Sequence, residues 1–438
     1  MANLFRILYF LSAGLRRLHW DKKKLRKYQE KRLRAVVRYA YEFVPFYHDK
    51  FRRVGLKPDD VRTLDDLSKL PIVRKDELRL VEPSLLVSKQ YDVGELKVLR
   101  TSGSTGKPFK FYISSVEDDW RKAIYLRANV SCGQRPRDKW VFVTSPRHFA
   151  DTTSIQRRLG IFAQDCISVF SRTADQVKLI REARPDVLDG YSGALFLVGR
   201  YVEREGISEV RPRLMFGSAD FIDVSARKYL EKVFNAPYYD QFGCSEVDRT
   251  AWQCPERVGY HMDVDSVITE FVDKDGNPVS AGEHGEIVHT SLFNFVMPFI
   301  RYSIGDVGRP SEDECPCGRV LPLMEVVEGR ADSFVVLPDG KLISPRAFTV
   351  AMSMFEYYEG IEQFRIIQRK IDCFDVLLKI KRADLAESDM AEKLKLHFQK
   401  VLGFSTKDVT FNVSFVDEIP LSKTGRLTAV ISEVARTA

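Results

Sequence analysis

Short apolar runs alternate with longer amphipathic segments between Lys97 and Gln241, and this alternation constrains the fold more than any other feature of the chain. The apolar runs predict buried strands. We place these strands at residues 140–144, 187–189, 214–216 and 238–241. The segments between them, such as 194–205 and 224–234, have helical periodicity. Strands and helices that alternate at this spacing predict a parallel sheet covered by helices, with the ligand-binding motifs at the carboxyl ends of the strands.

The pattern differs on both sides of this segment. Residues 1–95 look helical and basic, and we expect them to form the N-terminal segment of the large domain. From Met262 onward, hairpin patterns such as 271–279, with its Asp-Lys-Asp-Gly-Asn turn, predict a small antiparallel β-subdomain. Residues 96–330 would therefore contain the ligand-binding core together with this β-subdomain.

A second α+β pattern begins after Gly329. It consists of a hairpin and then helix, strand, strand, helix and strand, at residues 334–343, 346–358, 361–368, 375–381, 386–402 and 410–416. If the hairpin counts as the first strand, this is the β-α-β-β-α-β order of a ferredoxin-like domain. We therefore predict an α/β protein in which a large N-terminal domain precedes a smaller ferredoxin-like α+β domain at residues 331–438.

Composition and charge narrow the class of protein. The 438 residues are 44% hydrophobic and 29% charged, which is typical of a globular protein with two or three domains. Much of the net charge of +7 comes from residues 16–38 and the rest is near neutral, so we do not expect a nucleic-acid-binding protein. Seven cysteines, an odd number, without a secretion signal indicate a reduced, cytoplasmic protein.

The apolar segment at residues 3–15 is too short to span a bilayer, and Arg16 and Arg17 follow it without a cleavage site. Two interpretations remain for this segment. It is either a helix that packs on its own domain, which we favour, or an amphipathic helix in weak contact with an anionic membrane surface. The sequence also leaves a homodimer open.

Residues 101–107, Thr-Ser-Gly-Ser-Thr-Gly-Lys, form the most informative motif of the chain. The glycines let the backbone curl so that several N–H groups face one point, and the hydroxyls and the Lys107 ammonium add further donors. So many donors predict an anion site, most simply for a phosphate chain. A Walker A loop is excluded, because Thr101 stands where its first glycine should be and Pro108 replaces its hydroxyl residue.

Four further motifs follow along the chain: FGSA at 216–219, QFGCSE at 241–246, PFIRYSIGD at 298–306 and EGRAD at 328–332. In this order and together with residues 101–107, they resemble the motifs of the acyl-adenylate-forming enzymes, which include acyl- and aryl-CoA ligases, peptide-synthetase adenylation domains and luciferases. The segments VPFYHDKF, LPIVRKDELR and CPCGR, at 44–51, 70–79 and 315–319, look like the phenylacetate–CoA ligase branch, which includes relatives found with capsular-polysaccharide genes.

The resemblance implies a set of nucleotide-binding residues. They are Thr101, Ser102, Gly103, Ser104, Thr105, Gly106, Gly217, Ser218, Phe242, Gly243, Asp306, Arg330 and Asp332. The loop and Lys107 would bind the phosphates of ATP, and Glu246 would bind Mg²⁺. Asp306 would accept hydrogen bonds from the ribose diol, which requires an acceptor-only group.

The other implied roles concern the adenine and the domain hinge. Gly217 would let the flat ring approach the backbone, and the Phe242 ring would lie near the adenine or the acid. Arg330 would contact the nucleotide, and the mobile C-terminal domain would rotate about Asp332 between two half-reactions.

The last motif departs from the family pattern. The family ends in P-x-x-x-x-G-K, whose lysine bridges the carboxylate and the α-phosphate during adenylation. Here residues 420–426 read PLSKTGR, so Arg426 stands at the lysine position and Lys423 lies three residues earlier. Arginine keeps the charge but is a planar fork with a different reach. Either Arg426 or Lys423 serves as the catalytic cation, or adenylation is slow or lost.

A metal site is predicted apart from the nucleotide motifs. Cys254 and His261 flank a glycine-containing turn, and Cys315 and Cys317 form a close thiol pair. Three thiols and one imidazole suit tetrahedral zinc, and zinc-bearing relatives in the phenylacetate branch favour it. The alternative is that the cysteines are buried packing residues and the histidine is a surface residue.

The resemblance implies an ATP-dependent, AMP-forming ligase whose partners are a small-molecule carboxylic acid, ATP and CoA. One alternative keeps adenylation but transfers the acyl group to an amine or a sugar hydroxyl. A second alternative is a nucleotide-binding protein that has lost turnover, as the arginine at 426 suggests. His148 and Tyr191 follow predicted strands and are candidates for the wall of the acid pocket, although a lone histidine is more often an ordinary surface or pocket-wall residue.

Overall fold

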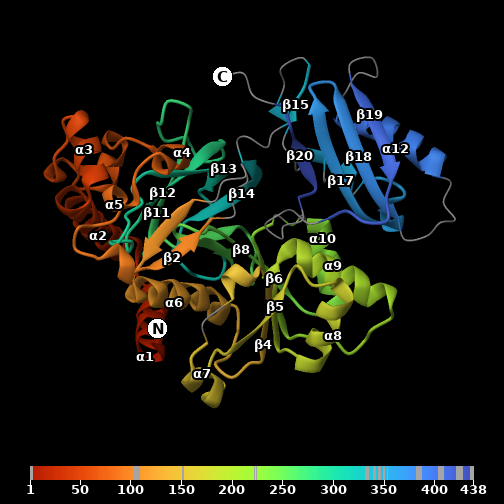
Figure 1. The fold of residues 1–438 in the computed structure, drawn as a ribbon, viewed down its shortest axis with the longest axis horizontal. Coiled ribbons are helices and arrows are strands. Elements are labelled where there is room, and N and C mark those ends of the chain that lie inside the picture. The colour runs from red at the N-terminus through yellow and green to blue at the C-terminus, as the bar shows by residue number, and fades with distance from the viewer. Residues whose placement is uncertain are drawn as a thin grey trace.

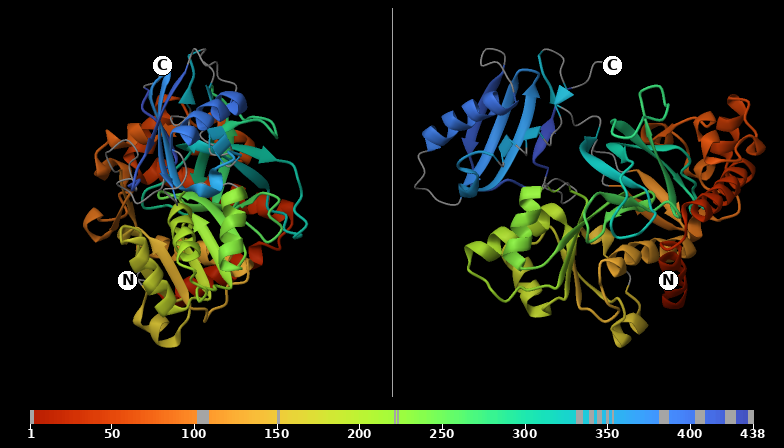
Figure 2. Two further views of the ribbon diagram at one scale, coloured as in Figure 1. Left: turned by 90° about the vertical axis from the view of Figure 1, so that its right-hand side faces the viewer. Right: turned by 180° about the vertical axis from the view of Figure 1, so that it is seen from behind.

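The computed structural model describes residues 3–101, 109–149, 152–220, 222 and 224–330 of the N-terminal part (Figure 1). Of the C-terminal part it describes residues 335–338, 342–343, 347–348, 351–352, 354–380, 387–402, 409–420 and 428–434. The views in Figure 2 show the C-terminal sheet and its helix as a separate body beside the larger N-terminal part.

Helices account for most of the first 90 residues, as predicted. They are α1 (Leu4–Arg17), α2 (Lys22–Phe43), α3 (Pro45–Arg53), α4 (Lys75–Arg79) and α5 (Pro83–Leu86). Helix α1 buries Leu4, Ile7 and Leu11 and packs along helix α6 (Ser115–Ser131), which confirms that the N-terminal segment docks on its own domain. Among the helices that the structure describes, none is both long and apolar enough to cross a bilayer.

Five parallel strands form one half of the large sheet, in the spatial order β5-β4-β6-β7-β8. Their bounds are β4 (Trp140–Thr144), β5 (Gln164–Ser168), β6 (Val187–Tyr191), β7 (Leu214–Ser218) and β8 (Tyr238–Cys244). All four predicted strands are present. They are buried on both faces, as parallel strands with helical crossovers usually are.

Alternate residues of these strands face opposite layers. Val141, Leu188 and Met215 belong to one apolar cluster with residues of α8 (Thr173–Ala183), α9 (Ser192–Arg204) and α10 (Val224–Phe234). Trp140, Val187 and Phe216 belong to the other cluster, which contains residues of α6. The predicted helix-covered parallel sheet is therefore confirmed.

The antiparallel half of the sheet is continuous with the parallel half. It consists of β9 (Asp248–Gln253), β10 (Tyr260–Met262), β11 (Val267–Val272), β12 (Gly285–Ser291), β13 (Tyr302–Ser311) and β14 (Leu323–Arg330). The antiparallel character was predicted, but β9 pairs with β8, so these strands extend the main sheet. The short strand β1 (Val73–Arg74) adds to β13 in parallel.

The phosphate-loop motif follows a strand, but not one of the parallel sheet. Strand β2 (Lys97–Arg100) pairs only with β3 (Lys110–Ile113) in a two-stranded antiparallel sheet. The prediction that every motif lies at the carboxyl end of a parallel strand is therefore wrong for this one. It is also wrong for the motifs at 298–306 and 328–332, which belong to the antiparallel strands β13 and β14. The antiparallel pairing of β2 and β3 brings Thr101 and Phe109 together, which parallel strands joined by so short a connection could not do.

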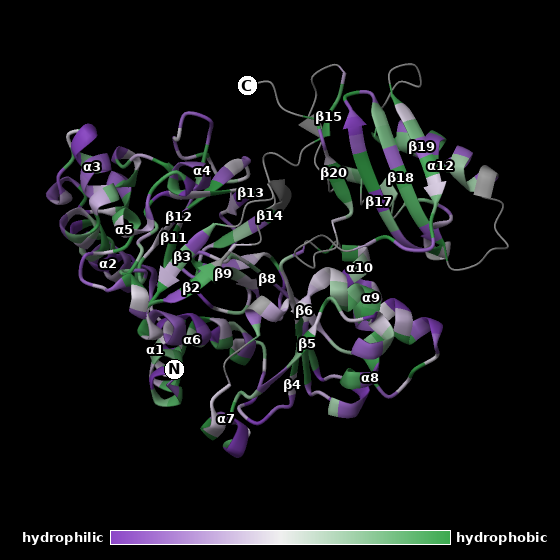
Figure 3. Cartoon of the chain, in the orientation of Figure 1, coloured by the Kyte–Doolittle hydropathy of each residue, from purple (hydrophilic) through white to green (hydrophobic). Residues whose placement is uncertain are grey.

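The C-terminal part has a four-stranded sheet of its own, in the order β19-β18-β17-β20. The strands are β17 (Ile361–Lys370), β18 (Cys373–Ile380), β19 (Thr410–Phe415) and β20 (Val430–Ser432), and helix α12 (Glu387–Leu402) packs on β19. Buried and half-buried residues alternate along most of β18 and along the first half of β17. Figure 3 shows hydrophobic and hydrophilic residues on both strands.

One strand of the C-terminal sheet was misplaced in the prediction. The hairpin β15 (Val335–Val336) and β16 (Leu342–Ile343) forms a separate two-stranded sheet, so it is not the first strand of the ferredoxin-like order. The place beside β17 belongs to β20, which pairs with it in parallel. Residues 430–432 are too few to give an alternating pattern that could have been recognised.

Side chains of α9 contact the beginning of β17 and hold the two parts together. Arg200 is buried, stacks over Phe196 and Tyr229, and donates to the Ile361 carbonyl. One turn later, Arg204 lies 3.5 Å from the Glu362 carboxylate. The C-terminal part thus rests on the helix that covers the parallel sheet.

Candidate functional site

A cavity of about 660 Å³ opens at the carboxyl ends of the parallel strands. Thr144 at the end of β4, Tyr191 at the end of β6, Ser218 at the end of β7 and Phe242 in β8 line it. Parallel strands bring these four positions to one edge of the sheet although they lie far apart in the sequence. This edge is where the sequence predicted that ligands bind.

Helix α6 forms the opposite wall of the cavity. Asp118, Arg121, Lys122, Tyr125 and Leu126 all line it, and their spacing of three and four residues places them on one helix face. This wall was not predicted from the sequence. The helical spacing of polar and apolar residues after Ser114 could have indicated this wall. The Ser114 side chain accepts a hydrogen bond from the Glu117 N–H and so caps the start of the helix.

A hydrogen-bonded pair, the half-buried Tyr125 and the buried Asp189, connects this wall to the sheet. The Tyr125 hydroxyl donates to both Asp189 oxygens, at 3.1 and 3.0 Å. Burial raises the pKa of Asp189 to about 7, although the hydrogen bond from Tyr125 works in the opposite direction. Neither residue was predicted, because a single aspartate inside an apolar strand gives no functional pattern.

The two candidates for the acid-pocket wall, His148 and Tyr191, lie side by side. The Tyr191 hydroxyl lies 2.8 Å from His148 Nδ1, and both residues line the cavity. His148 is therefore an exposed residue on the wall of the cavity, held there by this hydrogen bond.

The predicted adenine-side residues lie at the same strand ends, but the structure explains their glycines differently. A Cβ atom on Gly217 would lie 1.5 Å from the Tyr238 hydroxyl, so packing within the sheet requires glycine there. A Cβ atom on Gly243 would lie 2.2 Å from the Asp248 carbonyl oxygen, where β8 meets β9. Both glycines accommodate neighbouring protein atoms, whereas we expected Gly217 to accommodate an approaching ring. Ser218, Phe242 and Gly243 all line the cavity.

Glu246 is buried beside two polar partners. Its Oε1 atom accepts a hydrogen bond from the Tyr302 hydroxyl at 2.7 Å and pairs with Lys75 Nζ at 2.9 Å. Burial opposes the negative charge, but the Lys75 ammonium and the Tyr302 hydroxyl outweigh it and lower the pKa of Glu246. The carboxylate is therefore ionised at neutral pH.

The surroundings of Glu246 fit a hydrated magnesium ion. His289 is buried near Glu246. Burial lowers the pKa of His289 to about 3, although the negative charge of Glu246 acts in the opposite direction. Its Nε2 atom has no hydrogen-bond partner among the described residues. Mg²⁺ usually binds to one or two carboxylates and keeps several waters, and a neutral imidazole nitrogen can accept a hydrogen bond from such a water.

Asp306 and Arg330 are register partners on β13 and β14, at a bulge, so the two motifs that contain them meet. Asp306 is half-buried and is not among the residues that line the cavity.

Of the phosphate-loop motif, Thr101 lies within the described residues. Thr101 is buried, and its hydroxyl accepts a hydrogen bond from the Phe109 N–H at 3.1 Å, which closes the base of the phosphate-loop motif.

Several predicted residues lie outside the described part of the chain. They are Ser102, Gly103, Ser104, Thr105, Gly106, Lys107, Asp332, Lys423 and Arg426. The roles assigned to them remain predictions.

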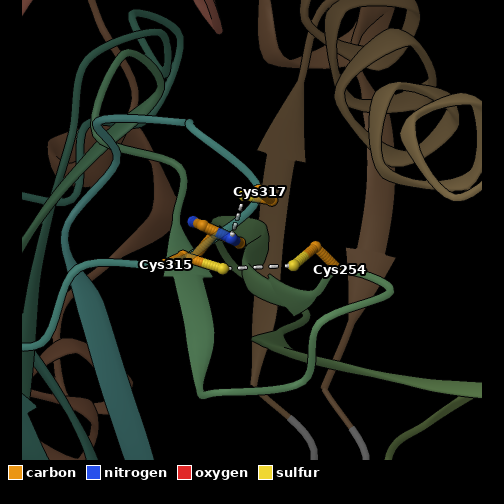
Figure 4. A group of neighbouring side chains, drawn as sticks. Cys254, Cys315 and Cys317 are labelled. Carbon is orange, nitrogen blue, oxygen red and sulfur yellow. Dashed lines mark hydrogen bonds between the residues drawn. The ribbon is translucent and has the colours of Figure 1, made fainter.

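The four predicted metal ligands come together. The ligand atoms of Cys254, His261, Cys315 and Cys317 all lie within 4.8 Å of one another. Cys254 Sγ lies 3.5 Å from Cys315 Sγ, and Cys317 Sγ lies 3.3 Å from His261 Nε2. Figure 4 shows the Cys315 and Cys254 thiols pointing toward each other, with Cys317 above them. Zinc–sulfur bonds of about 2.3 Å in a tetrahedron place ligand atoms about 3.8 Å apart, so the set fits zinc.

Strand pairing explains why these ligands meet. Cys254 directly follows β9, and His261 is in β10, the antiparallel neighbour of β9. Cys315 and Cys317 lie in the connection between β13 and β14, and β14 pairs with β10. Burial, and next the Arg319 charge, lower the pKa of His261 to about 4, so the imidazole is neutral at pH 7.

A buried carboxyl in β8, that of Asp240, predicts a pH-dependent stability. Burial raises the pKa of Asp240 to about 7, although the Tyr260 hydroxyl donates to it at 2.5 Å. The folded state then binds more protons than the unfolded state between about pH 4 and pH 7, so stability is lost as the pH rises through this range. Asp240→Asn should therefore gain about 2–3 kcal/mol of unfolding free energy, relative to the wild type, between pH 5 and pH 8.

Urea unfolding of both proteins at pH 5 and pH 8 measures this difference. Asp313→Asn changes an exposed carboxylate and is the matched control. An equal pH slope in the wild type and Asp240→Asn would show that the carboxyl is not buried in its protonated form.

Comparisons with known proteins agree with the geometry. Residues 335–433 match the family described as the CapK C-terminal domain. The phenylacetate-coenzyme A ligase of Escherichia coli (strain K12) is 27% identical over 408 residues, which cover 89% of this chain and 91% of the relative. Protein CapK of Staphylococcus aureus is 23% identical over 422 residues, which cover 93% and 89%.

Solved structures extend the comparison to the fold. 2-Hydroxyisobutyryl-CoA ligase, in its postadenylation state with 2-HIB-AMP, matches with a TM-score of 0.77 at 22% identity, over 94% of this chain and 90% of that protein. The likenesses therefore cover nearly the whole chain rather than one motif. The chain is a distant homologue of the phenylacetate–coenzyme A ligases, with the fold of the adenylate-forming ligases and a CapK-type C-terminal domain.

Proposed function

We propose that this chain activates a carboxylic acid with ATP to form an acyl-adenylate and pyrophosphate, and then transfers the acyl group to CoA. The observation that carries this proposal is that residues of two separate motifs line one cavity at the carboxyl edge of the parallel sheet. They are Ser218 of the motif at 216–219, and Phe242 and Gly243 of the motif at 241–246. The nearly full-length similarity to phenylacetate-coenzyme A ligases supports the same reaction.

The proposed reaction has two displacement steps. A carboxylate oxygen of the acid attacks the α-phosphorus of ATP, and the bond from that phosphorus to the bridging oxygen of the leaving pyrophosphate breaks. The CoA thiol, as it loses its proton, then attacks the acyl carbon, and the bond to the AMP oxygen breaks. Both steps depend mainly on positioning and on charge neutralisation.

The residues of this chain would divide these tasks as follows. Lys107 and the loop that precedes it would hold the phosphate chain, and Asp306 would hold the ribose. Glu246, ionised and buried, would hold Mg²⁺, which supplies positive charge to the phosphate oxygens when bound. Arg426 or Lys423 would neutralise the reacting oxygens.

The cavity wall supports an aromatic or otherwise apolar acid. Tyr125, Trp140, Phe142 and Phe149 line it together, and Tyr125 stacks with Trp140 at a ring distance of 6.2 Å. Flat apolar walls of this kind favour a ring that can stack or pack edge-on. The His148–Tyr191 pair on the same wall would orient a polar substituent.

A panel of carboxylic acids, assayed for pyrophosphate release with ATP and Mg²⁺, tests the proposal. At least one aromatic acid should release pyrophosphate, and the final product should then depend on CoA. Product formation with an amine or a sugar hydroxyl instead of CoA would favour the alternative acceptor. ATP binding without pyrophosphate release from any acid would favour a nucleotide-binding protein.

We also propose that Cys254, His261, Cys315 and Cys317 hold one structural zinc ion. All four protein ligand positions would be filled, which leaves no open position for catalysis. None of the seven cysteines, all of which lie within the described ranges, forms a disulfide, and this supports a reducing, cytoplasmic setting for the site.

A further inference from the structure

The segment at residues 70–79 resembles one branch of a superfamily, yet the proposed function gives it no role. In the structure, β1 lies parallel to β13, with Val73 opposite Tyr302, and the Val73 N–H donates to the Arg301 carbonyl at 2.9 Å. This pairing fixes the backbone immediately before Lys75, the first residue of α4.

The fixed backbone directs Lys75 to the carboxylate assigned to Mg²⁺. Lys75 Nζ lies 2.9 Å from Glu246 Oε1, the oxygen that also accepts the Tyr302 hydroxyl. The Glu246 side chain is 1% exposed, whereas the Lys75 side chain is 21% exposed. The lysine thus reaches from the open side of the site onto a carboxylate that solvent does not reach.

A divalent cation and the Lys75 ammonium cannot both bind this oxygen. Mg²⁺ lies about 2.1 Å from its oxygen ligands, which is closer than the ammonium now lies. Two cations that share one buried oxygen would repel each other strongly, because screening is weak there. An unpaired buried carboxylate also destabilises the folded chain. When the metal is absent, the Lys75 ammonium compensates the charge of Glu246 and removes this penalty.

We propose that Lys75 is an exchangeable counter-ion: it neutralises Glu246 in the ligand-free chain, and it moves to the phosphate chain of ATP when Mg²⁺ takes its place. This inference rests on the proposed function, since it assumes that Mg²⁺ and ATP bind here. It adds a second phosphate-binding cation, Lys75, that lies far in sequence from Lys107. A phosphate chain is the anion that would arrive at the same moment as the metal.

A titration with Mn²⁺, followed by electron paramagnetic resonance, tests whether Lys75 competes with a divalent cation for Glu246. It needs neither nucleotide nor carboxylic-acid substrate. Lys75→Met should bind Mn²⁺ about 10-fold or more tightly than the wild type, because the competing cation is gone. Lys50→Met is the matched control. Lys50 Nζ lies 2.6 Å from Oε1 of Glu77, which is in the same helix as Lys75, and Lys50 does not pair with Glu246. In a Glu246→Gln background, Lys75→Met should no longer change Mn²⁺ affinity.

Calorimetric titration with Mg·ATP tests the second half of the proposal. In the Glu246→Gln background, where Lys75 no longer competes with the metal for the carboxylate, adding Lys75→Met should weaken Mg·ATP binding about 10- to 100-fold, as for a lost charged hydrogen bond, and should leave AMP binding about unchanged. Unchanged or weaker Mn²⁺ binding, or unchanged Mg·ATP binding, would each overturn the proposal. If Lys75→Met does not fold, Lys75→Gln serves in both titrations.

These measurements separate this inference from the proposed function. Tighter Mn²⁺ binding in the variant, without pyrophosphate release from any acid by the wild type, would contradict the ligase activity alone. Pyrophosphate release by the wild type, with unchanged Mn²⁺ binding in the variant, would contradict the role of Lys75 alone.

Discussion

Replacing Cys317 with serine is expected to release about one zinc ion per chain and to cause a large loss of stability. Cys317 Sγ is 3.3 Å from the His261 imidazole, so the serine would leave a histidine and two thiols without their fourth ligand. The expected loss is a sizeable part of the roughly 10–16 kcal/mol with which structural zinc binds small zinc-finger peptides. Elemental analysis and thermal unfolding measure the two effects.

A matched variant separates zinc loss from the cost of any cysteine substitution. Cys373→Ser changes a half-buried cysteine of the C-terminal sheet and should keep both the zinc and the unfolding midpoint. A zinc chelator should destabilise the wild type much more than Cys317→Ser. A wild-type preparation that is free of metal and fully stable would contradict the zinc site.

Substitution of the correct basic residue in the terminal motif is expected to suppress pyrophosphate release by about 10²- to 10³-fold, as for other transition-state charge donors. The two candidates are Arg426 and Lys423. The physical reason is charge: the carboxylate that attacks and the α-phosphate are both anionic, and a cation between them lowers their repulsion. In an enzyme with alternating domains, the same variant should still convert a preformed acyl-adenylate to product.

Arg426→Ala, Lys423→Ala and Arg426→Lys, each assayed in both half-reactions, assign this role. If Arg426→Lys raises pyrophosphate release, the native arginine limits adenylation. If only Lys423→Ala is impaired, the working lysine lies three residues before its usual position. Equal losses in both half-reactions would instead indicate damage to the fold, which thermal unfolding would detect.

The parts of the fold that were predictable have a periodic signal. The parallel strands were found because runs such as residues 140–144 are apolar and are buried on both faces. Strand β9 was missed, since Asp248, Arg249 and Thr250 make its first half polar. Arg249 pairs with Asp263 in a buried charge network, and such a network has no recognisable pattern in one sequence.

The candidate site was predictable where a motif is contiguous in the sequence. Ser218 and Phe242 belong to such motifs, and both line the cavity. The Cys–His cluster comes from two short pairs far apart in the sequence, and it was predicted from the chemistry of its ligands. Lys75 was not assigned a role, because its distance from Glu246 is set by the pairing of β1 with β13. Contacts of this kind depend on tertiary structure and leave no mark on either segment alone.

Strand β9 ties the spacing of two sites together. Glu246 precedes β9 and Cys254 follows it, and β9 is hydrogen-bonded to β8 on one side and to β10 on the other. An inserted or deleted residue within β9 would turn all later side chains of the strand to the opposite face of the sheet. Changes in chain length should therefore be tolerated in the connections at 255–259 and 312–314. The eight-residue step from Glu246 to Cys254 should not tolerate such changes, because its length sets the distance between the two sites.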